Sequence, residues 1–145
     1  MGVMLSSWQF WAFLSAFFAA MTAILAKLGV RGIPPDVATF IRTIVILGFV
    51  TAILFATHQA GLVKTINRRS MVFLVLSGLA TGASWLCYFR ALDLGTASQV
   101  ASIDKLSVAM VAVIGAVVLN ETVGVTSALG IVLITAGTLV IASAK

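Results

Sequence analysis

Four charged residues of this sequence stand inside or at the ends of apolar runs long enough to cross a lipid bilayer: Arg42, Arg90, Asp104 and Lys105. A charge at such depth costs between roughly 3 and 15 kcal/mol, so we expect those kept there to be used. Arg42 either extends its head to the lipid headgroups or faces a cavity as a ligand for an anion or a carbonyl group. Aspartate is too short to extend in this way, so Asp104 needs a nearby cation. Lys105, Arg90 or Arg42 are the candidates.

The Asp104–Lys105 pair has two interpretations. It is either a structural ion pair or a participant in substrate or proton coupling. Ser98, Ser102 and Lys105 share one helical face, and Asp104 lies one residue off that face. Because Lys105 lies about seven residues into its apolar run, it is expected about 10 Å below the interface.

Polar residues also follow one helical face of the apolar run 71–92. Ser77, Thr81, Ser84 and Tyr88 are spaced by 4, 3 and 4, and Trp85 borders them. Hydroxyls beside two aromatic rings suit the wall of a cavity that holds a solute. Alternatively, the hydroxyls bond to neighbouring helices, at about 0.6 kcal/mol each. The full set of substrate-cavity candidates is Arg42, Ser77, Thr81, Ser84, Trp85, Tyr88, Ser102, Asp104 and Lys105.

The elements that must position these residues are membrane-spanning helices. Of the 145 residues, 61% are hydrophobic and 9% are charged, and the mean hydropathy is +1.19. These values exclude a soluble globule. The formal net charge of +5 does not indicate nucleic-acid binding, because the basic residues are scattered between apolar runs. They are better explained as determinants of topology and as contacts to anionic headgroups.

Five apolar segments of about 20 residues are long enough, at about 30 Å, to cross the hydrocarbon core. We expect an all-α polytopic membrane protein in which residues 1–145 form one five-helix domain. Pro34-Pro35 separates the first two helices, with Asp36 as a cap of the second, and Ser70 is the expected cap of the third. The expected helices cover about 8–28, 37–57, 71–92, 98–119 and 125–144.

The last predicted helix carries a row of residues suited to close packing. Ser127, Gly130, Ile134 and Gly137 recur at spacings of 3, 4 and 3. Small residues in such a row let another helix approach closely, so this helix is predicted to serve packing or dimerisation.

Other kinds of chemistry find no support in the sequence. Cys87 is the single cysteine, which excludes an intramolecular disulfide and a cysteine metal cluster. Zinc spacings, a nucleophile elbow, a phosphate-binding glycine loop and a glycosidase carboxylate pair are all missing, so we expect neither an enzyme, nor a cofactor, nor a metal site.

The distribution of positive charge does not select an orientation. With five crossings, one face receives Lys64, Arg68 and Arg69, and the other receives a similar number, Lys27, Arg31, Arg90 and Lys145. The chain is therefore predicted to insert both ways. The N-terminal run has no Lys or Arg, which argues against a cleaved signal peptide.

Residues 88–137 resemble part of an EamA-type domain of the drug/metabolite transporter superfamily. The resemblance rests on Tyr88-x-x-Ala91-Leu92, the turn 95–98, the motif Leu119-Asn120-Glu121-Thr122 and the glycine-rich segment 130–137. Pro35 and Phe40-Ile41-Arg42 also resemble the start of the second helix of such domains.

The resemblance implies a transporter in a bacterial inner membrane. Most such proteins have two inverted five-helix repeats with a substrate site between them. This chain has one repeat, which implies a homodimer of antiparallel copies around a small-molecule solute. The glutamate that four-helix relatives carry in their first helix is absent here, so its proton-coupling role cannot be transferred. The competing interpretation is a membrane accessory or assembly subunit that binds a partner through its small-residue helix faces.

Overall fold

The structure is a computed structural model that describes residues 7–143. Within that range it contains five helices long and apolar enough to cross a membrane, and no strand. The prediction of an all-α polytopic membrane protein is therefore confirmed. The predictions that concern the N-terminal six residues and Lys145 lie outside the described range.

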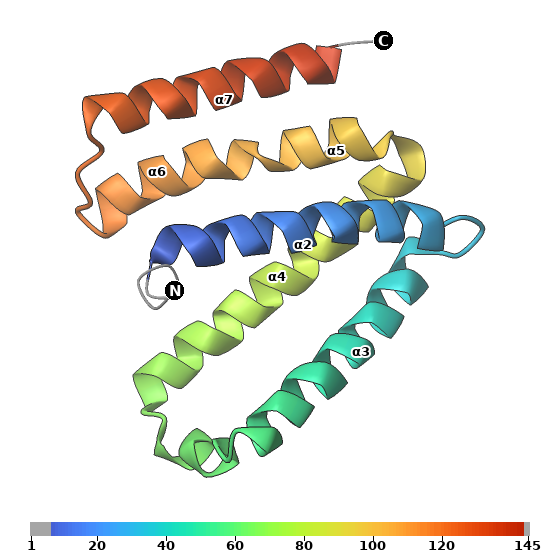
Figure 1. The fold of residues 1–145 in the computed structure, drawn as a ribbon, viewed down its shortest axis with the longest axis vertical. Coiled ribbons are helices and arrows are strands. Elements are labelled where there is room, and N and C mark those ends of the chain that lie inside the picture. Colours follow the sequence, from blue (N-terminus) through green and yellow to red (C-terminus); the bar gives the residue numbers. More distant parts are fainter. Residues whose placement is uncertain (1–6, 144–145) are drawn as a thin grey trace. The chain divides into compact units, whose positions relative to one another are not determined.

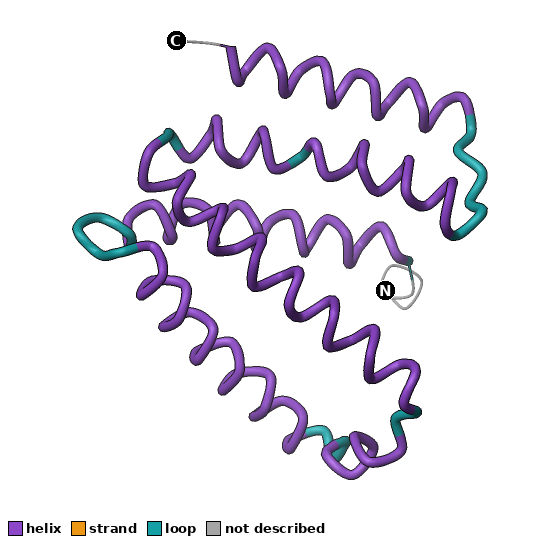
Figure 2. The backbone as a smooth tube through the Cα atoms, turned by 180° about the vertical axis from the view of Figure 1, so that it is seen from behind, coloured by secondary structure: helices purple, strands orange, loops and turns teal. Residues whose placement is uncertain are grey.

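The helices follow one another with short connections (Figures 1 and 2). They are α2 (Trp8–Gly29), α3 (Pro35–Ala56), the short 3₁₀ helix η1 (Ala60–Thr65), α4 (Arg68–Leu94), α5 (Ala97–Asp104), α6 (Leu106–Val118) and α7 (Val125–Ser143). Together α5 and α6 form a single span, Ala97–Val118. At 27 residues, α4 is about 40 Å long and exceeds the hydrocarbon core, so its charged ends reach the headgroup layers.

Two of the predicted helix caps are wrong. The N-cap of α3 is Pro34, and Asp36 lies inside the first turn without a capping hydrogen bond. Proline fits the first helical position because the N–H it lacks would have no partner there. Helix α4 begins before Ser70, and the Asn67 side chain accepts a hydrogen bond from the Ser70 backbone N–H at 2.7 Å. Asn67 therefore performs the capping that was assigned to Ser70.

The chain divides into two compact units, which are described separately. Of the described residues, the first unit comprises those up to Ile24 and those from Leu94, and the second is Leu25–Asp93. In the first unit, α7 packs along both α5 and α6. In the second, α3 and α4 run antiparallel and are joined through η1 (Figure 1). The most buried side chains of the second unit belong to Ala26, Val30, Thr39, Phe89 and Leu92, which lie near the ends of its helices opposite η1.

The span formed by α5 and α6 changes its hydrogen bonding at Lys105. The Lys105 N–H donates to the Ser102 carbonyl, and the Lys105 carbonyl accepts from the Val108 N–H, both at 3.0 Å. These i to i−3 bonds are of the 3₁₀ type, which tightens the helix locally. The single predicted helix 98–119 is thus two helices, α5 and α6, joined at Lys105.

The turn after α6 folds back onto the helix. Asn120 adopts a positive φ of 54°, a conformation that asparagine tolerates better than most residues. This brings the Glu121 N–H to 3.2 Å from the Gly115 carbonyl. A Cβ at Gly115 would lie 3.0 Å from the Glu121 carboxylate, so the glycine provides the space for that side chain. Glu121 remains exposed in this turn, with its carboxylate beside Gly115.

Candidate functional site

The best-defined polar cluster of the second unit is built around Arg42. Helix α3 presents Arg42 seven residues after its first residue, Pro35, which is about 10 Å along the helix axis. The Arg42 guanidinium carbon lies 4.2 Å from the ring centroid of Trp85 and 5.0 Å from that of Phe89. Trp85 and Phe89 are one helical turn apart on α4, so they present their rings on the same face.

The Arg42 side chain lies against α4, between two aromatic residues one helical turn apart. Trp85 is nine residues from the end of α4, about 14 Å, whereas Phe89 is five residues from it, about 8 Å. The guanidinium is closer to Trp85, the deeper of the two rings. Arg42 therefore packs against α4, closest to the ring that lies farther from the end of that helix.

No protein group neutralises the Arg42 charge within residues 7–143. The ion pairs of that range are Arg90–Asp36 and Lys105–Asp104, and Arg42 belongs to neither. Tyr88 lies beside Phe89 on α4, with the two ring centroids 6.5 Å apart. Cation–π contacts contribute about 0.5 to 2 kcal/mol, which is less than the cost of about 3 kcal/mol or more for an arginine at depth. The five N–H donors of the guanidinium remain available to an acceptor from outside these residues.

The threonine hydroxyls around Arg42 bond within their own helix. The Thr39 hydroxyl donates to the Pro35 carbonyl and the Thr43 hydroxyl to the Thr39 carbonyl, each at 2.9 Å. Such bonds to the carbonyl four residues earlier let threonine sit in an apolar environment without a partner on another helix. The threonines around Arg42 therefore do not compete for its guanidinium.

Three further cations lie at the same end of the second unit: Arg31 is exposed in the α2–α3 connection, and Arg90 and Lys27 have partners. The Arg90 guanidinium is 3.6 Å from the Asp36 carboxylate, which joins the last turns of α4 to the first turn of α3. The Lys27 ammonium donates to the backbone carbonyl of Leu92. That carbonyl is one of the last four of α4 and has no partner within the helix, so the lysine satisfies it.

The predicted polar face of α4 divides into two parts. Trp85 and Tyr88 are half-buried, whereas Ser77, Thr81 and Ser84 are exposed on the single chain. The Thr81 hydroxyl donates to the Ser77 carbonyl at 2.9 Å, within its own helix. None of the three hydroxyls bonds to another helix in the part of the chain that the structure describes.

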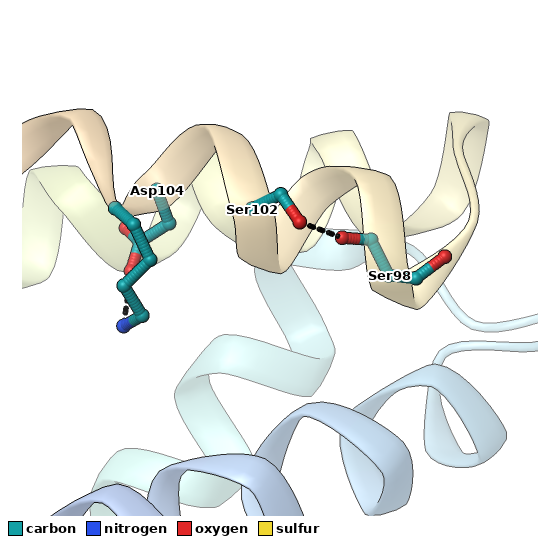
Figure 3. Close-up of polar contacts among 4 residues, drawn as sticks. Ser98, Ser102 and Asp104 are labelled. Atoms are coloured by element: carbon teal, nitrogen blue, oxygen red, sulfur yellow. Dashed lines mark hydrogen bonds and ion pairs between the residues drawn. The ribbon is translucent and has the colours of Figure 1, made fainter. Parts of the chain in front are cut away.

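Asp104 and Lys105 form the polar cluster of the first unit (Figure 3). The Lys105 ammonium is 3.5 Å from the Asp104 carboxylate, and the two side chains are 54% and 43% exposed on the single chain. The Ser102 hydroxyl donates to the Ser98 carbonyl at 2.7 Å. Of the three cations considered for Asp104, Lys105 is the partner, because Arg90 pairs with Asp36.

The small-residue row of α7 is not its main buried face within the chain. The buried and half-buried residues of α7 include Ile131, Thr135 and Thr138, with Thr138 only 4% exposed. A Cβ placed on Gly130 or Gly137 would meet nothing within 4 Å. Ser127, Ile134 and Gly137 are exposed and Gly130 is half-buried, so the row remains a predicted surface for contact between copies.

Sequence reasoning missed three members of the second unit's polar end. Phe89 was not singled out, although it follows Trp85 by four residues and therefore shares its face. Asp36 was treated only as a cap, because the α3–α4 pairing that brings it to Arg90 is not visible in the sequence. Lys27 was counted only as a topology determinant, and its Leu92 contact is set by packing.

Within residues 7–143, no group of three or more His, Cys, Asp or Glu side chains is placed to hold a metal ion. The chemistry that the Arg42 cluster offers is recognition of negative charge, since a guanidinium forms two parallel hydrogen bonds to a carboxylate or a phosphate.

Comparison with known proteins agrees with the membrane character of the fold. The model of the EamA-like transporter family matches residues 6–143. A Sinorhizobium sp. protein described as an uncharacterized transporter in the cobO 3′ region is 55% identical over 139 residues. The alignment covers 96% of this chain and 99% of that protein. No solved structure matches the chain significantly.

Proposed function

The chain belongs to the EamA-like transporter family and is a membrane transporter, and on that premise we propose that two antiparallel copies together move one small metabolite or drug-like solute. Each copy contributes residues 1–145 as one five-helix repeat. The proposed location is the inner membrane of a bacterium, in keeping with the Sinorhizobium source of the relative. The transporter is proposed to act without a cofactor and without catalysing a reaction.

The observation that carries the proposal is the single set of five spanning helices within residues 7–143. Transporters of many families build their substrate site near the midplane of the bilayer, between two repeats of opposite orientation. A second, inverted copy would supply the missing half of such a site. The near-equal Lys/Arg counts on the two faces support this arrangement, because they favour neither orientation.

The proposed cavity is lined by the polar residues of α3, α4 and α5. Arg42, Trp85 and Tyr88 lie together in one unit. The hydroxyl-bearing residues Ser77, Thr81, Ser84 and Ser102, together with the Asp104–Lys105 pair, are proposed to extend the polar lining. Between the copies, the row Ser127, Gly130, Ile134 and Gly137 would provide close helix contact, since its two glycines have free space around them.

The test is solute flux in liposomes that contain only the purified protein. A panel of radiolabelled metabolites and cationic dyes should give uptake or efflux above that of protein-free liposomes for at least one solute. An accessory subunit would give no flux with any solute, and would co-purify with a partner from the membrane of its host.

The antiparallel arrangement has its own test. Reporters fused to the C-terminus, one active only in the cytoplasm and one only outside it, should both give signal. Adding two lysines to the 58–67 loop should shift the ratio between them. One orientation that resists such changes would rule out an antiparallel homodimer, while leaving transport by a parallel pair possible.

A further inference from the structure

Arg42 has no ion pair among residues 7–143, and this indicates the chemical class of the solute. We propose that Arg42, held against Trp85 and Phe89, binds an oxyanion group, a carboxylate or a phosphate, and that the transported solute carries this group. The inference rests on the proposed transport function and specifies its substrate. It is argued from the contacts of the second unit alone.

Within that unit, Arg42 differs from Arg90 and Lys27, which have protein partners, and from Arg31, which is exposed in the α2–α3 connection. Arg90 lies 3.6 Å from the Asp36 carboxylate, and Lys27 donates to the Leu92 carbonyl. Arg42 has no ion pair and no hydrogen bond with any residue between 7 and 143. Its cation–π contacts do not offset the cost of its depth, so an additional anion would stabilise the folded state.

The surroundings of Arg42 suit the binding of an oxyanion. The ring centroids of Trp85 and Phe89 lie 4.2 and 5.0 Å from the guanidinium carbon, so the guanidinium packs against two aromatic rings. Arginine is only half-buried here, so part of its surface stays open to a solute. A guanidinium whose position is fixed binds a planar oxyanion through two N–H groups, which a lysine cannot reproduce.

The aromatic contact also supplies a built-in reporter. The chain has three tryptophans, and replacing Trp8 and Trp11 with phenylalanine leaves Trp85 as the single one. Because Trp85 touches Arg42, an anion bound to the guanidinium should change its fluorescence. This reporter detects binding independently of transport.

The experiment titrates this Trp8→Phe/Trp11→Phe protein in phosphatidylcholine vesicles with matched probes. Benzoate, glutarate and phenyl phosphate are compared with benzamide, glutaramide and phenol, and flux is measured in parallel with radiolabelled benzoate and benzamide. We expect at least one oxyanion to change Trp85 emission and its neutral analogue to have no effect. Arg42→Gln should weaken that binding at least tenfold, and Arg42→Lys should weaken it less. Arg90→Gln is the control and should leave it unchanged.

The outcomes separate this inference from the transport function. Flux of neutral and anionic probes alike, unaffected by Arg42→Gln, would overturn the anion specificity and leave transport intact. Arg42-dependent binding without any flux would support the oxyanion site and count against transport. Equal emission changes with benzoate and benzamide would overturn the site. If Arg42→Gln aggregates, the site is tested by titrating the Trp8→Phe/Trp11→Phe protein, with and without Arg42→Lys, with each oxyanion and its neutral analogue.

A lipid headgroup is the other source of an oxyanion at this position. The same titrations are repeated in vesicles that contain about three parts of anionic phosphatidylglycerol in ten, enough to give the negative surface that basic groups bind. Emission that changes with lipid composition and no longer responds to benzoate would assign the bound phosphate to lipid and overturn the solute assignment. Unchanged benzoate affinity in both vesicles supports a solute site.

Discussion

Arg42 and Asp104 occupy equivalent places in their spans, and they are neutralised differently. Each lies seven residues after the first residue of its helical span, Pro35 for Arg42 and Ala97 for Asp104. Asp104 has a cation beside it in the sequence, and their charged groups are 3.5 Å apart. Arg42 has two aromatic rings and no carboxylate among the described residues.

We infer different roles for the two sites from this comparison. A pair that is neutral within one chain needs nothing from outside, so Asp104 and Lys105 can persist at depth through every step of a transport cycle. An unpaired guanidinium keeps its full charge and interacts strongly with any anion that reaches it. The first arrangement suits a structural or coupling element, and the second suits a binding site.

Removing one charge of the neutral pair should have the largest effect on stability. Asp104→Asn leaves the Lys105 ammonium without its carboxylate at depth. We expect the free energy of unfolding to fall by about 3 kcal/mol, the lower end for one-sided loss of a pair, because both side chains are about half exposed on the single chain. Unfolding in mixed micelles with increasing SDS measures the change.

The double variant Asp104→Asn/Lys105→Met is the matched control. It removes both charges, so most of the lost stability should return. If it is as unstable as Asp104→Asn, the loss comes from the shape of the α5–α6 junction and not from the unpaired charge. If Asp104→Asn folds normally but loses substrate binding or the pH dependence of flux, the pair serves coupling.

The second prediction asks whether water reaches the polar face of α4 beside Arg42. In a Cys87→Ser background, Ser84→Cys should react with a membrane-impermeant maleimide about tenfold faster than Leu86→Cys, because lipid excludes the reagent from the opposite face. Leu86 is two residues away, at nearly the same depth, and 40% exposed on the single chain. Equal protection of both cysteines would indicate that the Arg42 side is sealed, and would favour packing of this face against another helix.

Replacing the unpaired cation should change stability in the opposite direction from Asp104→Asn. Arg42→Met removes a charge whose depth costs about 3 kcal/mol, and it loses cation–π contacts of about 2 kcal/mol at most. The variant should therefore be about 1 kcal/mol more stable than the original chain in the same SDS titration. A loss of stability comparable to that of Asp104→Asn would mean that Arg42 has a carboxylate partner in the assembled protein, contributed by another copy.

The number and type of the helices could be predicted from the sequence, because apolar length is a strong signal in a membrane protein. The five segments bounded by prolines, glycines and charges all correspond to spans. Less predictable were the helix ends, since they depend on which side chain meets a free backbone group. Asn67, and not Ser70, fulfils that role for α4.

The candidate site could be predicted only in part. Residue type and depth identified Arg42, Asp104 and Lys105, because a charge in an apolar run is conspicuous in the sequence. The partner of a charged residue could be predicted only where the two are adjacent in sequence, as Asp104 and Lys105 are. The Arg42–Trp85 contact joins residues 43 positions apart, and it depends on the register between α3 and α4, which apolar periodicity leaves open.

Removing the ion pair between Arg90 and Asp36 should change the free energy of unfolding least. The pair provides a reference for the effects of Arg42 and Asp104. Its side chains are 69% and 63% exposed, at the ends of α4 and α3, where the headgroup layer provides water and ions. Exposed pairs contribute about 0 to 1 kcal/mol. Asp36→Asn should therefore lower the free energy of unfolding by about 0.5 kcal/mol in the same SDS titration, and raising the salt concentration should reduce the difference further. Arg42 and Asp104 are taken to lie farther from water than Arg90 and Asp36. If Asp36→Asn lowers stability as much as Asp104→Asn, distance from water does not determine how much a charge contributes to the stability of this chain.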